Sequence, residues 1–301
     1  MSTEKRGSVG VVGLGNMGSA MAANLVNAGF EVIGTDVLSE ACAAAAKAGA
    51  KVVSSVREVG EACRHIILSL PSETALYEVC GILAVSCAKG TIVLETGTLP
   101  LAAKQKMLKL LAEKGVTLLD CPLSGTGAQA KKRDLAVYAS GDSMAIQEVR
   151  PVIDAFARAC YDLGEFGNGI KTKLVANLLV SVHNVVAAEA ILFGVRSGLD
   201  PVNLVKVLSD GAGASRMLQV RGPIMANRSW VEETTASITI LQKDINLITE
   251  ALRAAECPAP AFAACTPIYI AAIASGHANH DPASVYEVIE RMTLAPATKG
   301  S

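Results

Sequence analysis

Residues 8–18 read Ser-Val-Gly-Val-Val-Gly-Leu-Gly-Asn-Met-Gly, an apolar run that ends in three glycines with the spacing Gly13-x-Gly15-x-x-Gly18. A helical pattern follows from Ser19 to Ala28. A glycine turn between a strand and a helix is typical of dinucleotide-binding sites. The first glycine makes the tight turn, the second admits a pyrophosphate, and the third lets the helix pack against the strand. The helix N-terminus adds amide donors and a partial positive charge.

A second apolar run, Glu31–Thr35, leads into Asp36, eighteen positions after Gly18. An acidic residue about 20 positions beyond the glycines typically binds the adenosine ribose hydroxyls and repels a 2′-phosphate. No arginine follows Asp36 directly, so the sequence predicts NAD, with NADP less favoured. A plain strand–helix turn with a solvated aspartate is the alternative. The residues predicted to bind the cofactor here are Gly13, Leu14, Gly15, Asn16, Met17, Gly18 and Asp36.

Up to about Gly164, short β-rich runs alternate with helical patterns, which predicts parallel strands joined by crossover helices. Several runs lack polar alternation, as strands covered on both faces do. We therefore expect an α/β, doubly wound Rossmann-type sheet as the middle layer of a dinucleotide-binding domain, residues 1–166. The expected strands are Val9–Val12, Glu31–Thr35, Lys51–Val53, His65–Leu70, Thr91–Glu95, Thr117–Asp120, Leu135–Ser140 and Ala159–Leu163.

Strand signals stop after Gly169, where a long apolar segment runs to about Ser197 and further helical stretches follow. This predicts an all-helical second domain, residues 167–301, for substrate binding and oligomerisation. The stretch from Leu174 to Val195 is apolar enough to imitate a membrane span, but polar side chains such as Asn184 and Glu189 are costly in hydrocarbon. We expect a buried helix and no membrane contact.

Composition excludes several other classes. The formal net charge is −1 and no basic stripe is present, so nucleic acid is not an expected partner. Eight cysteines show no C-x-x-C pair, which favours reduced thiols over a zinc site or disulfide framework, and no metal is expected. The first fifteen residues lack the apolar core of an export signal, so we expect a cytoplasmic protein.

Four ordered motifs give the chain its family resemblance. They are GLGNMGSAMAANLVNAG at 13–29, DCPLSGTG at 120–127, GNGIKTKLVAN at 167–177, and Lys243-Asp244. Together they resemble the β-hydroxyacid dehydrogenases, which include 3-hydroxyisobutyrate, tartronate semialdehyde and L-threonate dehydrogenases, over nearly the whole chain. The resemblance implies NAD-dependent oxidation of a short-chain 3-hydroxy acid, or reduction of the corresponding oxo acid or semialdehyde.

Lys173 is the expected general acid/base, because the matching lysine in the family has that role. Oxidising an alcohol requires loss of the hydroxyl proton as hydride leaves, and a desolvated lysine can accept it. Asn177 lies four residues on, on the same helix face, and the resemblance implies that it positions the substrate. Lys171 faces elsewhere and is expected at the surface. A solvated helix lysine is the alternative for Lys173.

Ser124 and Gly125 are expected to hold the substrate carboxylate, since a hydroxyl and exposed amides follow a strand end there, and Thr126 is expected to bind substrate in the same stretch. An ordinary glycine–serine turn is the alternative. The other residues expected along the cofactor are Leu70, Pro71, Thr96 and Lys243. The alternative for Pro71 is a proline that simply ends a strand, and the alternative for Lys243 is a surface ion pair with Asp244.

Three positions depart from the family pattern: Thr126 replaces a glycine, Gly97 a threonine, and Ala176 an asparagine or histidine. They leave the substrate unassigned. The rival functions are an imine reductase or other reductase of the same superfamily, a sugar-phosphate dehydrogenase, and a non-catalytic dinucleotide-binding module. Apolar helices in the second domain predict a homodimer or homotetramer.

Overall fold

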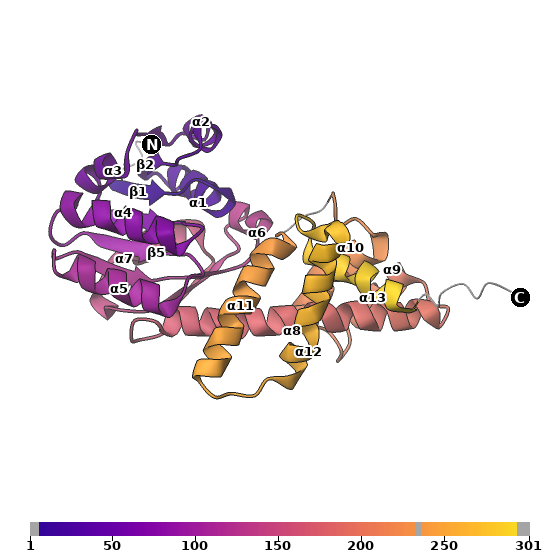
Figure 1. Cartoon of the computed structure of the whole chain (residues 1–301). Coiled ribbons are helices and arrows are strands. Elements are labelled where there is room, and N and C mark those ends of the chain that lie inside the picture. Colours follow the sequence, from indigo (N-terminus) through magenta and orange to yellow (C-terminus); the bar gives the residue numbers. More distant parts are fainter. Residues whose placement is uncertain (1–5, 233–235, 294–301) are drawn as a thin grey trace, which may run out of the picture. The chain divides into compact units, whose positions relative to one another are not determined.

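The computed structural model describes residues 6–232 and 236–293, and the chain divides into two compact units after Lys173. Helix α8 (Asn168–Arg196) begins in the first unit and continues through the second. The first unit alternates strands with helices, whereas every element of the described part of the second unit is helical (Figure 1). The predicted fold class is therefore confirmed.

The main sheet of the first unit has six strands, all parallel, in the order β3-β2-β1-β4-β5-β6. Its centre is β1, where Val9 pairs with Val32 on one side and with His65 on the other. From β1 the chain adds β2 and β3 on one side and β4 to β6 on the other. At such a switch in strand order, open α/β sheets leave a ligand-binding crevice at the carboxyl ends of the strands. The strands are β1 (Ser8–Val12), β2 (Glu31–Thr35), β3 (Lys51–Val52), β4 (His65–Leu68), β5 (Ile92–Glu95) and β6 (Thr117–Asp120).

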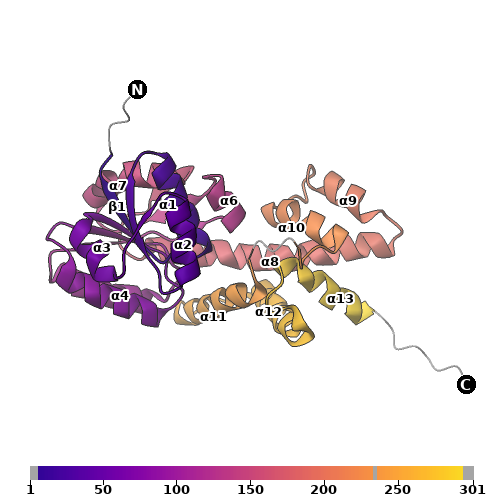
Figure 2. The same ribbon diagram turned by 90° about the horizontal axis from the view of Figure 1, so that it is seen from above.

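Helices cover both faces of this sheet. Along β4 the side chain of Ile67 joins one apolar cluster while Ile66 and Leu68 join another, as expected when successive residues point to opposite faces. Helices α1 and α7 contribute to the first cluster and α3, α4 and α5 to the second (Figure 2). The helices of this unit are α1 (Asn16–Asn27), α2 (Ser39–Lys47), α3 (Val56–Ala62), α4 (Glu73–Ser86), α5 (Leu101–Ala112), α6 (Gly127–Lys131) and α7 (Ser143–Phe156).

A smaller sheet adjoins the main one. Strand β8 (Ala136–Ala139) pairs antiparallel with β7 (Leu123–Ser124) and parallel with β9 (Ala159–Asp162), and a bridge between Asp120 and Ser140 ties it to the end of β6. The expected strands near β8 and β9 exist but belong to this second sheet. Strand β7 was not expected, because two residues carry no periodicity.

The second unit surrounds most of α8 with α9 (Pro201–Leu208), α10 (Arg216–Asn227), α11 (Ile238–Ala254), α12 (Pro260–Ala272), a short π turn (Ile273–His277), a 3₁₀ turn (Pro282–Ser284) and α13 (Val285–Thr293). By length and apolar composition alone α8 could cross a membrane. Two of its polar groups have partners within this unit: the Asn184 amide donates to the Tyr269 hydroxyl and the Pro282 carbonyl, and the Ser181 carbonyl accepts from Tyr269. The helix thus forms part of the core of this unit.

Candidate active site

The glycine turn after β1 has the geometry that each glycine was expected to provide. Gly13 has a φ of +90°, and a β-carbon there would lie 2.2 Å from the Ser69 carbonyl oxygen. A β-carbon on Gly18 would lie 1.9 Å from the Gly13 carbonyl oxygen, so this contact between helix and turn requires glycine. Gly15 differs, because nothing lies within 4 Å of its β-carbon position. The space beside Gly15 is the open side of the turn.

Helix α1 begins immediately after Gly15, and no side chain caps its first turn. Asn16 is exposed and Met17 is half-buried at this end. Uncapped amides at a helix N-terminus, next to an open glycine, suit a pyrophosphate. The residues present therefore fit the phosphate part of a dinucleotide.

Asp36 follows β2 at the same edge of the sheet. Its Oδ2 accepts a 2.6 Å hydrogen bond from the backbone N–H of Leu14, and its Oδ1 accepts one of 2.8 Å from Leu38. The carboxylate is thus locked beside the glycine turn by two backbone donors. Oxygens held in this way retain lone pairs for ribose hydroxyls, since each carboxylate oxygen accepts more than one hydrogen bond.

The turn after β5 completes this edge. The Thr96 side chain is buried and donates to the Leu68 carbonyl at 2.7 Å, which joins the ends of β5 and β4. Gly97 has a structural reason to be glycine: a β-carbon there would lie 2.6 Å from Glu95 Oε1 and 3.2 Å from the Leu70 carbonyl oxygen. Leu70 is half-buried and Pro71 exposed, just beyond the end of β4.

The segment expected to bind a carboxylate lies near the glycine turn. Ser124 ends β7, and Gly125 adopts a φ of +139° with no room for a β-carbon beside Leu135. Thr126 caps α6: its hydroxyl accepts from the Gln129 N–H and its own N–H donates to Gln129 Oε1. The Thr126 hydroxyl can still donate its proton, but one of its acceptor positions is used by the cap.

Helix α6 connects this segment to the dinucleotide turn. The Asn24 amide on α1 donates to the Ala130 carbonyl at 2.8 Å, and a β-carbon on Gly127 would lie 3.9 Å from Asn16 Cβ. The residues from Ser124 to Gly127 and the start of α1 are therefore neighbours within the first unit.

Lys173 lies on the second turn of α8 and is half-buried, whereas Lys171 is exposed and donates to Asn168 Oδ1. Asn177 is buried, and its amide donates to Asp244 Oδ2 at 2.7 Å. Lys243 Nζ lies 2.8 Å from Asp244 Oδ1. Asp244 thus joins two expected site residues, Asn177 and Lys243, in the second unit, while the other expected site residues lie in the first.

Comparisons with known proteins agree with this geometry. The model for the NAD binding domain of 6-phosphogluconate dehydrogenase matches residues 8–164, more than half of the chain, and the model for the NAD-binding domain of NADP-dependent 3-hydroxyisobutyrate dehydrogenase matches residues 167–289. L-threonate dehydrogenase of Cupriavidus necator is 31% identical over 95% of this chain and 97% of its own. The chain belongs to the β-hydroxyacid dehydrogenase family.

Solved structures show how far this likeness extends. The 3-hydroxyisobutyrate dehydrogenase of Mycobacterium tuberculosis, solved with L-serine, superposes with a TM-score of 0.84 at 27% identity, covering 94% of this chain and 98% of that one. An imine reductase from Pseudomonas sp. shares the fold with a TM-score of 0.63 at 20% identity, covering 94% and 99%. This β-hydroxyacid dehydrogenase uses NAD, consistent with its family.

One buried cluster near the site carries a role that the sequence did not reveal. Lys104, on the first turn of α5, has no exposed side-chain surface and lies 2.6 Å from both Glu95 Oε2 and Asp120 Oδ1. Asp120 begins one of the family motifs and Glu95 ends an expected strand, but neither was assigned a role from the sequence. Lys104 gave no signal, because a lysine in an amphipathic helix is normally at the surface.

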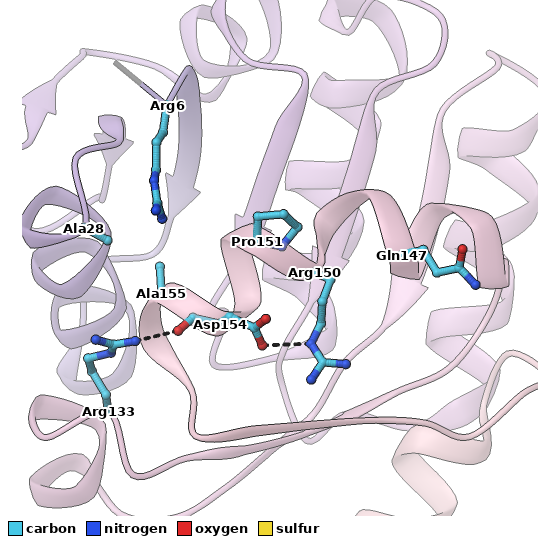
Figure 3. Close-up of a pocket in the computed structure, with 8 residues that line it drawn as sticks. All are labelled: Arg6, Ala28, Arg133, Gln147, Arg150, Pro151, Asp154 and Ala155. Carbon is cyan, nitrogen blue, oxygen red and sulfur yellow. Dashed lines mark hydrogen bonds and ion pairs between the residues drawn. The ribbon is translucent and has the colours of Figure 1, made fainter. Parts of the chain in front are cut away.

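Figure 3 shows a surface hollow on the first unit. It borders the amino ends of β1 and β2, whereas ligands of open α/β sheets bind at the carboxyl ends. Two of its arginines already donate to Asp154, Arg150 to the carboxylate and Arg133 to the carbonyl. The hollow is lined by Arg6, Ala28, Arg133, Gln147, Arg150, Pro151, Asp154 and Ala155. It does not form part of the active site of this dehydrogenase.

Two glycine variants separate folding from cofactor binding. Gly15 has φ −64° and ψ −164°, a conformation that alanine also adopts, so Gly15→Ala should keep the melting temperature of the parent. Its methyl group would lie against the pyrophosphate, so the variant should bind NAD about tenfold more weakly or worse, a loss of roughly 1.4 kcal/mol. Gly18→Ala should instead lower stability by about 1–3 kcal/mol, because its methyl group meets the Gly13 carbonyl. Thermal unfolding and NAD titration measure both. Unchanged NAD affinity in Gly15→Ala would contradict the assigned pyrophosphate site.

Proposed function

We propose that this chain oxidises a short-chain 3-hydroxy acid with NAD, or reduces the corresponding oxo acid or semialdehyde. The observation that carries the proposal is the anchoring of the start of α8, which bears Lys173, to Asp120 and Ser140 at the strand ends of the first unit. The glycine turn and the Ser124 segment belong to that same unit. Relatives named for L-threonate and 3-hydroxyisobutyrate act on hydroxy acids.

In this proposal each residue has a defined chemical task. NAD, when bound, supplies the nicotinamide carbon that accepts the hydride. The neutral Lys173 amine accepts the substrate hydroxyl proton as the carbonyl forms, and its ammonium returns that proton in the reverse reaction. Ser124 and Gly125 hold the substrate carboxylate by a hydroxyl and backbone amides, and Thr126 belongs to the same substrate-binding stretch. The side-chain oxygen of Asn177 orients the substrate, while the side-chain NH₂ group donates to Asp244.

Asp36 supports a preference for NAD over NADP. Its two oxygens are fixed by the Leu14 and Leu38 amides, so the carboxylate cannot swing away to admit a 2′-phosphate without losing both hydrogen bonds. Val37 and Leu38 follow it, and neither side chain can pair with a phosphate. We further assign the cofactor edge to Leu14, Asn16, Met17, Leu70, Pro71 and Thr96, and the nicotinamide end to Lys243.

The rival functions predict different chemistry at the same positions. An imine reductase of this fold would not need a lysine at position 173, and a binding module would need neither Lys173 nor Asn177. A sugar-phosphate dehydrogenase would require cationic groups to clamp the phosphate. The half-buried lysine and the buried amide on one face of α8 favour the dehydrogenase.

We also propose a domain boundary at residues 166 and 167, a cytoplasmic location and a homodimer or homotetramer. The two compact units meet later in the chain, after Lys173, because Asp120 and Ser140 bind the first turn of α8. All eight cysteines are free, as expected in a reducing compartment. Exposed apolar residues follow one stripe along α8, at Val175, Leu179, Val186 and Phe193, which suits a subunit interface.

The reaction itself is tested by following NADH formation with a panel of C3 to C5 hydroxy acids, with NADP and cyclic imines in parallel arms. We expect turnover of at least one 3-hydroxy acid, with NAD preferred over NADP by about tenfold or more in kcat/KM, equivalent to roughly 1.4 kcal/mol. Turnover confined to imines would favour the reductase. NAD binding with no turnover of any substrate would favour the binding module.

Two lysines on the same helix offer a matched test of the acid/base role. Lys173→Ala should lower kcat by about 100-fold or more while leaving NAD affinity unchanged, since a positioned general base contributes 10²–10⁴-fold. Lys171→Ala, two residues away and exposed, should stay within about twofold of the parent, as a surface change of up to 0.5 kcal/mol would allow. Near-normal turnover by Lys173→Ala would exclude this lysine as the base.

The oligomer is tested at the most exposed member of the stripe. Phe193 is 76% exposed, so Phe193→Glu should not disturb the subunit but should reduce the mass seen by light scattering. Gln105→Glu adds the same charge at an exposed position on α5 and should leave the mass unchanged. A parent protein that is monomeric at all concentrations would rule out the proposed homo-oligomer.

A further inference from the structure

The ammonium group of Lys104 is the centre of a buried network. Its Nζ lies 2.6 Å from Glu95 Oε2 and from Asp120 Oδ1, and it donates to the Gly97 carbonyl at 2.8 Å. Three partners use all three of its protons. The side chains of Lys104, Glu95 and Asp120 have no exposed surface. The network therefore reaches the turn after β5, which it holds through both the carbonyl and the N–H of Gly97.

The other end of the network holds the beginning of α8. Asp120 Oδ2 accepts a 2.8 Å hydrogen bond from the Ile170 N–H and a 3.1 Å one from the Ser140 hydroxyl. Ser140 Oγ in turn accepts from the N–H groups of Gly167 and Gly169, at 3.2 and 2.9 Å. Three amides at the helix start are thus bound by two side chains. The carboxylate also lies where the helix dipole favours negative charge.

The start of α8 also packs closely against the strand ends that bind it. A β-carbon on Gly169 would lie 2.4 Å from the Tyr138 carbonyl oxygen and 2.8 Å from the Asp120 carbonyl oxygen. The helix therefore begins directly against the ends of β6 and β8. Lys173 lies three residues after Ile170, less than one turn further along the same helix.

We infer that Lys104, Asp120 and Ser140 are positioning residues for the acid/base step, because they fix the first turn of α8 relative to the Gly97 turn at the cofactor edge, and Lys173 follows on the next turn. This inference rests on the proposed function of Lys173. None of the three residues is proposed to touch the substrate. A displacement of about 1 Å at a reacting group can cost up to 100-fold in rate, so an anchor of this kind affects kcat more than binding.

The charges in this network fit a role in positioning α8 better than a role in stability alone. Burial acts to lower the pKa of Lys104, but the two carboxylates outweigh it and raise that pKa, so the ammonium stays charged. Burial raises the pKa of Glu95 despite the nearby lysine. Replacing buried ion pairs by apolar residues is often neutral or stabilising, so cohesion alone would not require charges here. Hydrogen bonds of fixed direction can define a position, which an apolar contact does less well.

Two variants and two matched controls test the inference. Ser140→Ala removes the hydroxyl that binds the Gly167 and Gly169 amides, and Asp120→Asn removes the charge while keeping the shape. Ser284→Ala and Asp281→Asn make the same changes at buried positions of the second unit, where Asp281 pairs with Arg221. For each variant we would measure the melting temperature, NAD affinity, kcat and KM with the preferred hydroxy acid, the deuterium isotope effect on hydride transfer, and amide hydrogen exchange of residues 165–174.

We expect faster exchange at residues 167–170 in both network variants, with kcat lowered about tenfold or more. NAD affinity should stay within about threefold, and the isotope effect should rise as hydride transfer becomes rate-limiting. The controls should keep both kcat and exchange at 165–174. If Asp120→Asn does not fold, Ser140→Ala, which loses only a hydroxyl, decides the question.

Loosened exchange with unchanged kcat would overturn the inference, because the anchor would then be structural only. Lower kcat with unchanged exchange would also overturn it, because the effect would not act through α8. A drop in kcat equal to that in the controls would show a general stability effect and overturn it as well. Normal turnover by Lys173→Ala would contradict the proposed function itself, and this result can be told apart from the three above.

Discussion

Asp120 must remain paired if its carboxylate is to stay buried at the start of α8. An unpaired buried charge costs several kcal/mol, and removing one partner of a buried pair typically costs about 3–5 kcal/mol. Lys104, Ser140 and the Ile170 amide together satisfy that carboxylate. The end of β6, the end of β8 and the start of α8 are consequently held at one point. The position within the first unit of Lys173, which we propose as the acid/base, depends on this point.

Most of the fold could be predicted because its signals are local. The glycine turn is a steric requirement that no other residue meets at Gly13 or Gly18, and it appears in the sequence as a fixed spacing. The strands buried on both faces appear as unbroken apolar runs, and helix starts such as those after Ser72 and Asp142 carry capping side chains. The second sheet could not be separated from the first in this way, because pairing partners leave no periodic trace and β7 has only two residues.

The network around Lys104 could not be predicted, for the same reason. Its contacts join residues 16 and 50 positions apart, Lys104 with Asp120 and Asp120 with Ile170, and no sequence period links them. Thr126 was expected to bind substrate, and the structure shows that its hydroxyl also caps α6. Asn177 and Lys243 were expected separately, and only the folded structure shows that Asp244 contacts both. The residue types in the sequence indicated the chemistry of the site, but only the fold determines which of these side chains contact one another.

The departures from the family pattern now divide into two kinds. Gly97 is required by the folded-back Glu95 side chain, whose Oε1 accepts from the Gly97 N–H at 2.7 Å, so its cause lies in the buried network. Thr126 has a structural role as the α6 cap. Neither one, taken alone, therefore identifies a substrate. Among the described residues no contact gives Ala176, next to Asn177 on α8, such a role, and it stays our prediction that the loss of a side-chain amide there changes which substrate hydroxyls can be paired. Substrate selectivity is best sought at Ala176.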